Sequence, residues 1–174
     1  ALIDDVFGPV MRSAGMTLAP FNAWVVLKGL ETLGIRMKAQ SEQALALAEW
    51  LEAQDPVARV YYPGLKSHPQ HELAMLQQSG MGGAVFSFEV KAQSAEQGRE
   101  NAFKVMNAMR TVSLCTNLGD VKTLVAHPAS TSHGRLTEAQ RQVAGIQQSL
   151  IRVAVGLENL EDLKADFLRG FQAL

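Results

Sequence analysis

The 174-residue sequence predicts an α/β fold in which helices cover one face of a mostly antiparallel sheet. Three observations carry this prediction. Apolar residues recur at helical spacing over the first third of the chain, and after Pro56 the period changes to strand-like alternation. Beyond that point short strands and helices follow one another. Several strand-to-strand connections are short, which favours antiparallel pairing over parallel crossovers.

Two helical stretches precede the first predicted strand. Residues 2–13 carry apolar side chains at helical spacing, and Gly15 is a typical residue for a helix C-cap. A longer helix is predicted over residues 21–54, with an apolar stripe along one side. Gly29 and Gly34 weaken the middle of this helix, so we expect a break or kink at one of them.

The later elements are predicted in the order β-α-β-α-β-β-α-β-α. Ser67 is the N-cap candidate for the first helix of this series, because Pro69 and several leucines follow it. Glu161 and Asp162 suit the positive end of the last helix. The predicted strands are 57–62, 84–90, 112–114, 122–126 and 150–155, and the predicted helices are 67–78, 94–109, 137–145 and 160–171.

Composition is that of an ordinary globular protein and argues against several classes of partner. About half of the residues are hydrophobic (47%), and the net charge is −1. The basic residues form no stripe, so no partner of the nucleic-acid or anionic-membrane class is expected. No apolar run reaches the length of a transmembrane helix. A lone Cys115 excludes an internal disulfide and fits a reducing compartment.

Arg152 is the residue that most needs an explanation. It lies in the run 150–155, whose alternating and β-branched side chains are typical of a buried strand. A guanidinium group cannot lose its proton, so its burial requires an anion or several acceptors. A structural partner such as Glu158 or Asp162 would satisfy it. A ligand carboxylate would do so as well, through two parallel hydrogen bonds.

Other polar groups have a structural and a functional interpretation. The turn 117–120 (Asn-Leu-Gly-Asp) can present N–H groups to an anion, although a plain strand-to-strand turn is the simpler interpretation. His68 and His71 lack the further ligands that zinc needs, so capping and surface roles are favoured. His127 and His133 flank a polar loop, where hydrogen bonds that orient the loop are favoured over a general-base role.

Four segments together resemble the pyridoxal-phosphate enzymes of cysteine and methionine metabolism, the cystathionine γ-synthase-like family. The match covers the whole chain, in order and with ordinary spacing. It implies the small carboxy-terminal domain of the type I pyridoxal-phosphate transferase fold, preceded by a long connecting helix from the large domain. The four segments begin Thr17-Leu-Ala-Pro-Phe-Asn-Ala-Trp, Tyr62-Pro-Gly-Leu-Lys-Ser-His-Pro, Asn117-Leu-Gly-Asp-Val-Lys-Thr-Leu and Leu150-Ile-Arg-Val-Ala-Val-Gly-Leu.

The resemblance also implies roles for particular residues. Arg152 matches the family arginine that holds the α-carboxylate of the substrate. Asn117 stands where many relatives have a serine that lines the substrate pocket, and Leu118 contributes backbone to the same wall. Ser132 matches a hydroxyl residue that orients the arginine or the carboxylate. None of the seven lysines lies in the family's cofactor-lysine motif, so no catalytic residue is expected in this chain. No metal ligand is expected either, because the histidines lack further ligands at a suitable spacing.

The resemblance divides the chain into residues 1–53, the end of the cofactor-binding large domain with its connecting helix, and residues 54–174, the small domain. The start Ala-Leu-Ile-Asp-Asp, without an initiator methionine and in a helical pattern, indicates a fragment. Asn-Leu-Gly-Asp followed by Pro-Ala-Ser-Thr-Ser-His-Gly-Arg is most similar to the O-succinylhomoserine sulfhydrylases of the family. Cystathionine synthases and lyases more often have Ser-Leu-Gly-Gly.

The implied parent is a cytoplasmic, homotetrameric enzyme that makes homocysteine from O-succinylhomoserine and sulfide by γ-replacement. Pyridoxal 5′-phosphate is its implied cofactor, bound by the large domain, and the fragment alone is expected to be inactive. Two alternatives stay open. One is another enzyme of the family: a cystathionine γ-synthase, an O-acetylhomoserine sulfhydrylase or a γ-lyase. The other is a non-enzymatic binding module that stands alone.

Overall fold

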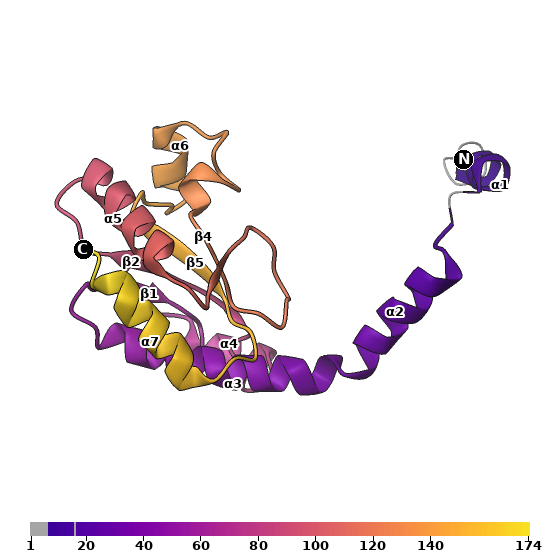
Figure 1. The fold of residues 1–174 in the computed structure, drawn as a ribbon, viewed down its shortest axis with the longest axis horizontal. Helices are drawn as coiled ribbons and strands as arrows, with labels where there is room; N and C mark the ends of the chain where they lie inside the picture. The colour runs from indigo at the N-terminus through magenta and orange to yellow at the C-terminus, as the bar shows by residue number, and fades with distance from the viewer. Residues whose placement is uncertain (1–6, 16) are drawn as a thin grey trace. The chain divides into compact units, whose positions relative to one another are not determined.

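The computed structural model describes residues 7–15 and 17–174 (Figure 1). The chain divides into two compact units, Ala1–Ile35 and Arg36–Leu174. The second unit contains the sheet and every described buried residue. No helix among the described residues is long and apolar enough to cross a membrane.

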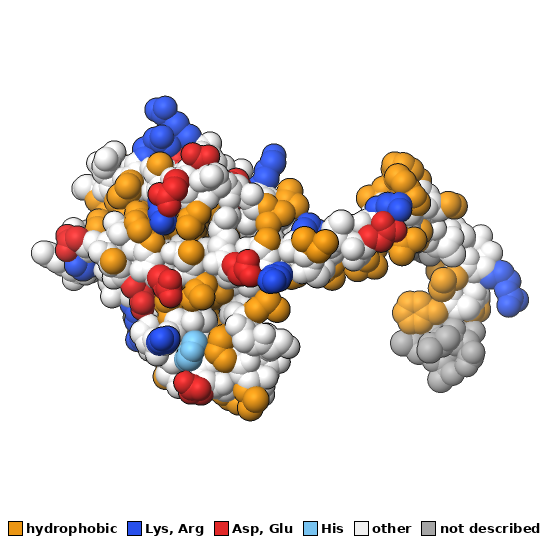
Figure 2. All heavy atoms as spheres, turned by 90° about the horizontal axis from the view of Figure 1, so that it is seen from below, with side chains coloured by type: hydrophobic (Ala, Val, Ile, Leu, Met, Phe, Trp, Pro, Cys, Tyr) orange, Lys and Arg blue, Asp and Glu red, His pale blue; other side chains and the backbone are white. Residues whose placement is uncertain are grey.

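The first unit contains α1 (Gly8–Ala14) and α2 (Pro20–Glu31). α1 ends where the sequence predicts, because Gly15 adopts the left-handed φ of 62° and its N–H donates to the Met11 carbonyl at 3.0 Å. The predicted start of this helix lies outside the described residues. Figure 2 shows apolar side chains at the surface of this unit. The exposed large apolar residues include Phe21, Trp24, Val25, Val26, Leu27 and Leu30.

The long predicted helix is two helices. α2 ends at Glu31 and α3 (Leu33–Glu52) begins two residues later, so the break falls at Thr32 and not at either glycine. Thr32 has φ −107° and ψ 3°, and its hydroxyl donates to the Gly29 carbonyl at 3.4 Å. A threonine loses side-chain freedom in a helix and offers the backbone a competing hydrogen bond. These two effects account for a break between the glycines.

Five strands form one sheet in the order β1-β2-β5-β4-β3, which confirms the predicted mixed α/β fold. The pairs β1–β2, β2–β5 and β4–β5 are antiparallel, and β3–β4 is parallel. Because β3 and β4 are short, the loop 115–123 is long enough to return the chain for a parallel pairing. The strands are β1 (Val57–Tyr61), β2 (Val85–Val90), β3 (Ser113–Leu114), β4 (Leu124–Ala126) and β5 (Leu150–Ala154).

Three helices pack on one face of the sheet: α3, α5 (Ala95–Ala108) and α7 (Leu160–Phe171). Phe88 of β2 is fully buried there and meets Phe167 and Phe171 of α7 edge-on, with ring centroids 5.9 and 6.3 Å apart. Burying one such side chain stabilises a protein by about 1.5–3 kcal/mol. We call the opposite side of the sheet the outer face. It carries a smaller apolar cluster of Ala129, Ile146 and Leu150, with Tyr61 packed against it.

One predicted helix start is wrong. α4 spans His71–Gln77 and has Gln70, not Ser67, at its N-cap. The Ser67 hydroxyl instead donates to Glu52 at the end of α3, at 2.6 Å. His68 Nδ1 accepts from the Gln70 N–H at 3.2 Å, so this histidine stabilises the preceding turn. Because the Ser67 hydroxyl binds Glu52, it does not cap α4, and the helix begins at His71.

The helices α5 (Ala95–Ala108), α6 (Glu138–Val143) and α7 (Leu160–Phe171) begin within one residue of their predicted starts, and each has a side-chain N-cap. Ser94 accepts from the Gln97 N–H at the start of α5, and Asn159 accepts from Glu161 at the start of α7. α6 (Glu138–Val143) has a complete capping box formed by Thr137 and Gln140. A 3₁₀ turn, η2 (Pro128–Ser130), follows β4.

Candidate active site

Arg152 lies in the middle of β5 on the outer face of the sheet. Its neighbours Ile151 and Val153 are buried against α3, α5 and α7, and strand alternation therefore places Arg152 on the other side. Its partners across the sheet are Ser87 on β2 and Ala126 on β4. The residue is half-buried, in agreement with the sequence-based expectation of a sheltered arginine.

Two backbone carbonyl groups hold the Arg152 guanidinium. Nη2 donates to the Thr116 carbonyl at 2.7 Å and to the Asn117 carbonyl at 3.3 Å. Both acceptors follow β3, so the side chain extends across β4, where the paired residue is the small Ala126. Arg152 Nε is buried and has no hydrogen-bond partner in the part of the chain that the structure describes.

Neither predicted structural partner pairs with Arg152. Glu158 accepts from the Thr123 N–H at 2.6 Å and from the Thr123 hydroxyl at 2.7 Å. Asp162 is exposed in the first turn of α7. The ion pairs among residues 7–15 and 17–174 do not include Arg152, so no carboxylate of the described residues neutralises its charge.

The turn 117–120 brings one predicted site residue, Asn117, to Arg152. Asn117 contributes its carbonyl group to the guanidinium, and Leu118 follows it with half of its surface exposed. Gly119 has φ 83°, a conformation that a glycine adopts without strain. Asp120 Oδ1 then accepts from the Lys122 N–H at 3.1 Å. Toward Arg152 the turn therefore presents carbonyl groups, which are acceptors for a cation.

Gln40 joins α3 to this turn, and sequence analysis missed it. Its side chain is buried, and Nε2 donates to the Asp120 carbonyl at 2.8 Å and to the Val155 carbonyl at 2.9 Å. One signal could have revealed it. Gln40 stands four residues before Ala44 and seven before Leu47, on the buried stripe of the helix. A polar residue on such a stripe needs a partner.

Close backbone packing holds the segment after β5 against the start of β4. A Cβ atom on Gly156 would lie 2.4 Å from the Val121 carbonyl oxygen and 2.5 Å from Glu158 Oε2, so only glycine fits. The Gly156 N–H donates to the Thr123 hydroxyl at 2.9 Å, and that hydroxyl donates to Glu158. The end of the 115–123 loop is therefore fixed by hydrogen bonds in which Thr123 both donates and accepts.

The predicted site residue Ser132 lies in the loop that follows β4 and η2. It is exposed, and its hydroxyl lies 2.9 Å from His133 Nδ1. No hydrogen bond joins Ser132 to Arg152 in the described ranges. The geometry thus unites Arg152 with Asn117 and leaves the hydroxyl of Ser132 in a separate loop.

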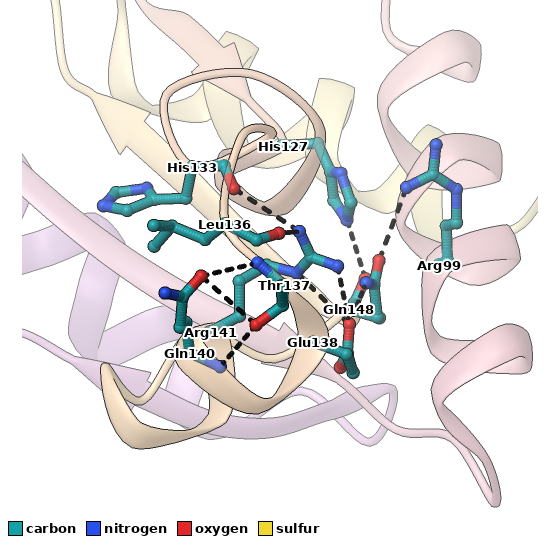
Figure 3. A network of polar contacts seen from close by, with 9 residues as sticks. All are labelled: Arg99, His127, His133, Leu136, Thr137, Glu138, Gln140, Arg141 and Gln148. Carbon is teal, nitrogen blue, oxygen red and sulfur yellow. Dashed lines mark hydrogen bonds and ion pairs between the residues drawn. The ribbon is translucent and has the colours of Figure 1, made fainter.

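That loop is organised by His127, as the loop-orienting interpretation predicts (Figure 3). His127 is 1% exposed; Nε2 lies 2.8 Å from the Gln148 carbonyl and Nδ1 lies 2.8 Å from the Ser130 hydroxyl. A carbonyl only accepts, so in the neutral ring Nε2 carries the proton and Nδ1 accepts from Ser130. Burial lowers the pKa of His127, and the charges of Arg99 and Arg141 lower it further.

Side chains from α5, from α6 and from the segment before β5 complete this network (Figure 3). Gln148 donates to Glu138 at 2.9 Å and accepts from Arg99 at 3.4 Å. Arg141 forms an ion pair with Glu138 at 2.9 Å and donates to the Leu136 carbonyl. Hydrogen bonds from Arg141, and then from Gln148, lower the pKa of Glu138. The network connects the loop after β4 to α5 and to the residues that lead into β5.

The lysine side chains lie at the surface of the described residues. Six of the seven lysines are exposed, and the seventh, Lys164, pairs with Glu161 at 2.7 Å. Lys28, Lys91 and Lys104 are also in surface ion pairs. No cluster of three metal-ligating side chains occurs in the part of the chain described.

Comparisons with known proteins point to one family. Residues 3–172 match the family described as Cys/Met metabolism PLP-dependent enzyme. The chain is 64% identical to O-succinylhomoserine sulfhydrylase of Pseudomonas aeruginosa over 94% of its own length and 39% of that protein. It is 43% identical to O-acetyl-L-homoserine sulfhydrylase 1 of Thermus thermophilus over 90% of its length and 36% of that protein.

A solved structure has the same fold. The crystal structure of cystathionine gamma-lyase from Lactobacillus plantarum, complexed with L-serine, superposes with a TM-score of 0.83 at 31% sequence identity. The likeness covers 98% of this chain and 43% of that one. The chain therefore spans about two-fifths of the length of the proteins that it matches.

Proposed function

Because the chain belongs to the Cys/Met metabolism PLP-dependent enzyme family, we propose that it is the carboxy-terminal part of an O-succinylhomoserine sulfhydrylase. The observation that carries this proposal is the 64% identity to such an enzyme over 94% of the chain. The parent enzyme would replace the γ-succinyl group of O-succinylhomoserine with sulfide and release homocysteine. Pyridoxal phosphate is the cofactor of the family and, when bound, supplies the electron sink.

In this proposal Arg152 binds the α-carboxylate of the substrate. The carbonyl groups of Thr116 and Asn117 orient the guanidinium through Nη2, and no carboxylate of the described residues competes for its charge. An arginine oriented in this way, with unpaired donors remaining, suits a planar anion. Holding the carboxylate would fix the direction of the bonds at the adjacent carbon, which is a contribution of orientation rather than of proton transfer.

The proposal assigns residues 1–53 to the end of the cofactor-binding large domain and residues 54–174 to the small domain. It places the cofactor lysine in the part of the relatives that this chain does not span. It follows that the chain alone is inactive, because its own lysines are exposed or in surface ion pairs. A homotetrameric, cytoplasmic parent is part of the same proposal.

An assay of the full-length parent tests the reaction. O-succinyl- and O-acetyl-L-homoserine would each be offered with sulfide or with L-cysteine, and L-methionine would be offered alone. We expect the highest kcat/KM for the succinyl ester with sulfide. Preference for cysteine would assign a cystathionine γ-synthase, preference for the acetyl ester an O-acetylhomoserine sulfhydrylase, and elimination from methionine a γ-lyase. Absence of turnover with every pair would favour a binding module.

A further inference from the structure

Gln40 occupies an unusual position between the strand that carries Arg152 and the turn that orients it. Its single amide nitrogen donates to the Val155 carbonyl, three residues after Arg152, and to the Asp120 carbonyl, three residues after Asn117. The side chain is 1% exposed, and its Oε1 has no hydrogen-bond partner among the described residues. A buried glutamine with an unpaired oxygen forms its hydrogen bonds only as a donor, so the two N–H groups are the part of the side chain that holds its neighbours.

The amide of Gln40 connects the 115–123 loop to α3. Among the described residues, the other hydrogen bonds near this part of the loop do not reach α3. The Cys115 N–H donates to the Val125 carbonyl at 3.0 Å and fixes the beginning of the loop beside β4. The Asp120 carboxylate bonds within its own turn, to Lys122. Gln40 holds the Asp120 carbonyl and therefore sets how far the turn stands from α3. The carbonyl groups of Thr116 and Asn117 lie between these two anchors.

We propose that Gln40 is a positioning residue for Arg152: by joining Val155 to Asp120 it holds the 116–120 turn where its carbonyl groups orient the guanidinium. This role rests on the proposed binding of the substrate carboxylate by Arg152. Gln40 touches neither substrate nor cofactor in this account and acts through the turn alone. Removing its two donors lets the turn move, and the guanidinium loses the direction that carboxylate binding requires.

The same helix offers a matched control. Gln43 lies one turn later on α3, and its Nε2 donates to the Gly156 carbonyl at 3.2 Å. It therefore binds the segment after β5, and among the described residues no hydrogen bond joins it to the 116–120 turn. Gln40→Met and Gln43→Met remove the same chemical groups and keep a similar volume. Gln40→His keeps one ring N–H that can reach one of the two carbonyls.

The first readout is the Nε–Hε resonance of Arg152 in the nitrogen-15-labelled 174-residue chain, assigned from its loss in Arg152→Lys. We expect Gln40→Met to shift this resonance and to speed its hydrogen exchange, because Nε is buried in the wild-type chain. Gln43→Met should leave it in place, and Gln40→His should give an intermediate change. An unchanged resonance in folded Gln40→Met would overturn the proposal. So would unfolding of both Gln40 variants, since Gln40 would then act on stability.

The second readout is a double-mutant cycle in the full-length parent with O-succinyl-L-homoserine and sulfide. Gln40→Met should raise KM and lower kcat/KM on the order of tenfold, a coupling common within one hydrogen-bond network. In an Arg152→Ala background the same substitution should have little further effect. Equal losses in both backgrounds would assign Gln40 a general structural role. Wild-type kcat/KM in the Arg152→Ala single variant would instead refute the proposed role of Arg152 in substrate binding. The resonance experiment would then decide by itself whether Gln40 positions the Arg152 side chain.

Discussion

At the scale of single residues, Arg152 shows what a sequence can and cannot reveal about a site. A guanidinium group in an apolar strand is charged and needs acceptors that the strand itself does not supply. The sequence alone therefore identifies Arg152 as a candidate site residue. Its acceptors, Thr116 and Asn117, precede it by 36 and 35 residues. They become neighbours only through the sheet order β5-β4-β3 and through the small Ala126 between them. Neither the strand order nor the register can be read from the spacing along the sequence. The prediction of Glu158 as a structural partner relied on that spacing and was wrong.

We predict that Arg152→Ala in the full-length parent lowers kcat/KM by roughly thirty- to several-thousand-fold. A charge-assisted pair to a sheltered carboxylate loses about 2–5 kcal/mol when one partner is removed, and each 1.36 kcal/mol is about tenfold in rate. Arg152→Lys should recover part of the loss, because an ammonium group cannot form the planar fork. Steady-state kinetics measure this effect. Thermal unfolding is the control: the freed carbonyls of Thr116 and Asn117 belong to exposed residues, so Tm should change little.

His127 predicts a pH dependence of stability. Burial holds its pKa below the ordinary 6.5 of the unfolded chain. Between the two pKa values the unfolded chain binds more protons than the folded chain, so the free energy of unfolding falls as the pH drops below about 6.5. Above that pH the ring is neutral in both states and contributes no slope.

Urea unfolding from pH 5 to pH 8 tests this dependence, with His127→Gln as the comparison. Glutamine can still donate to the Gln148 carbonyl but does not titrate, so the difference between the two proteins isolates the imidazole. The wild-type chain should lose stability relative to His127→Gln as the pH falls. Parallel curves for the two proteins would mean that the buried ring does not change its protonation on unfolding.

At the scale of elements, the predictions that succeeded rest on short-range signals. The caps of α5, α6 and α7 each involve residues two or three positions apart, so sequence alone contains both partners. Ser67 has the same residue type as Ser94, yet its hydroxyl binds Glu52, which lies 15 residues away. The break at Thr32 has a different cause, because Gly29, Thr32 and Gly34 each weaken a helix locally and the sequence does not rank them. Element types are predictable here, whereas boundaries are not where a distant partner or several similar local preferences decide them.

Asp166 of α7 connects that helix to the segment entering β3. The side chain is 1% exposed, and its carboxylate accepts from the backbone N–H groups of Arg110, Thr111 and Val112 at 2.8 to 3.0 Å. Burial alone would raise the pKa of Asp166, but the backbone hydrogen bonds, with the charge of Arg169, lower it. The carboxylate is therefore ionised where three donors converge.

We predict that Asp166→Asn destabilises the chain by about 2–4 kcal/mol, because an amide presents N–H groups to those donors and leaves one of them unpaired. Asp162→Asn is the matched control on the same helix; it is exposed and should change stability by less than about 0.5 kcal/mol. Chemical denaturation compares the two variants. Equal stabilities would show that the carboxylate does not hold the segment before β3.

At the scale of the whole molecule, the two units differ in what they bury. The unit Arg36–Leu174 has a continuous core between the sheet and three helices. In the unit Ala1–Ile35 every described residue is exposed, and large apolar side chains cover α2. Phe21 is 71% exposed and Trp24 is 55% exposed. Monomeric proteins rarely leave so many neighbouring apolar side chains in water, so a chain of this kind gains free energy by covering them.

We therefore predict that the isolated 174-residue chain self-associates through α2. Sedimentation velocity over a wide range of concentration should show a mass that rises with concentration. Combining Phe21→Gln, Trp24→Gln and Leu27→Gln should reduce this association, since each change removes exposed apolar area without touching the core of the other unit. Leu73→Gln with Leu76→Gln is the control, because these residues are also apolar and exposed but lie on α4. A strictly monomeric wild-type chain, or an equal effect of the control, would contradict association through α2.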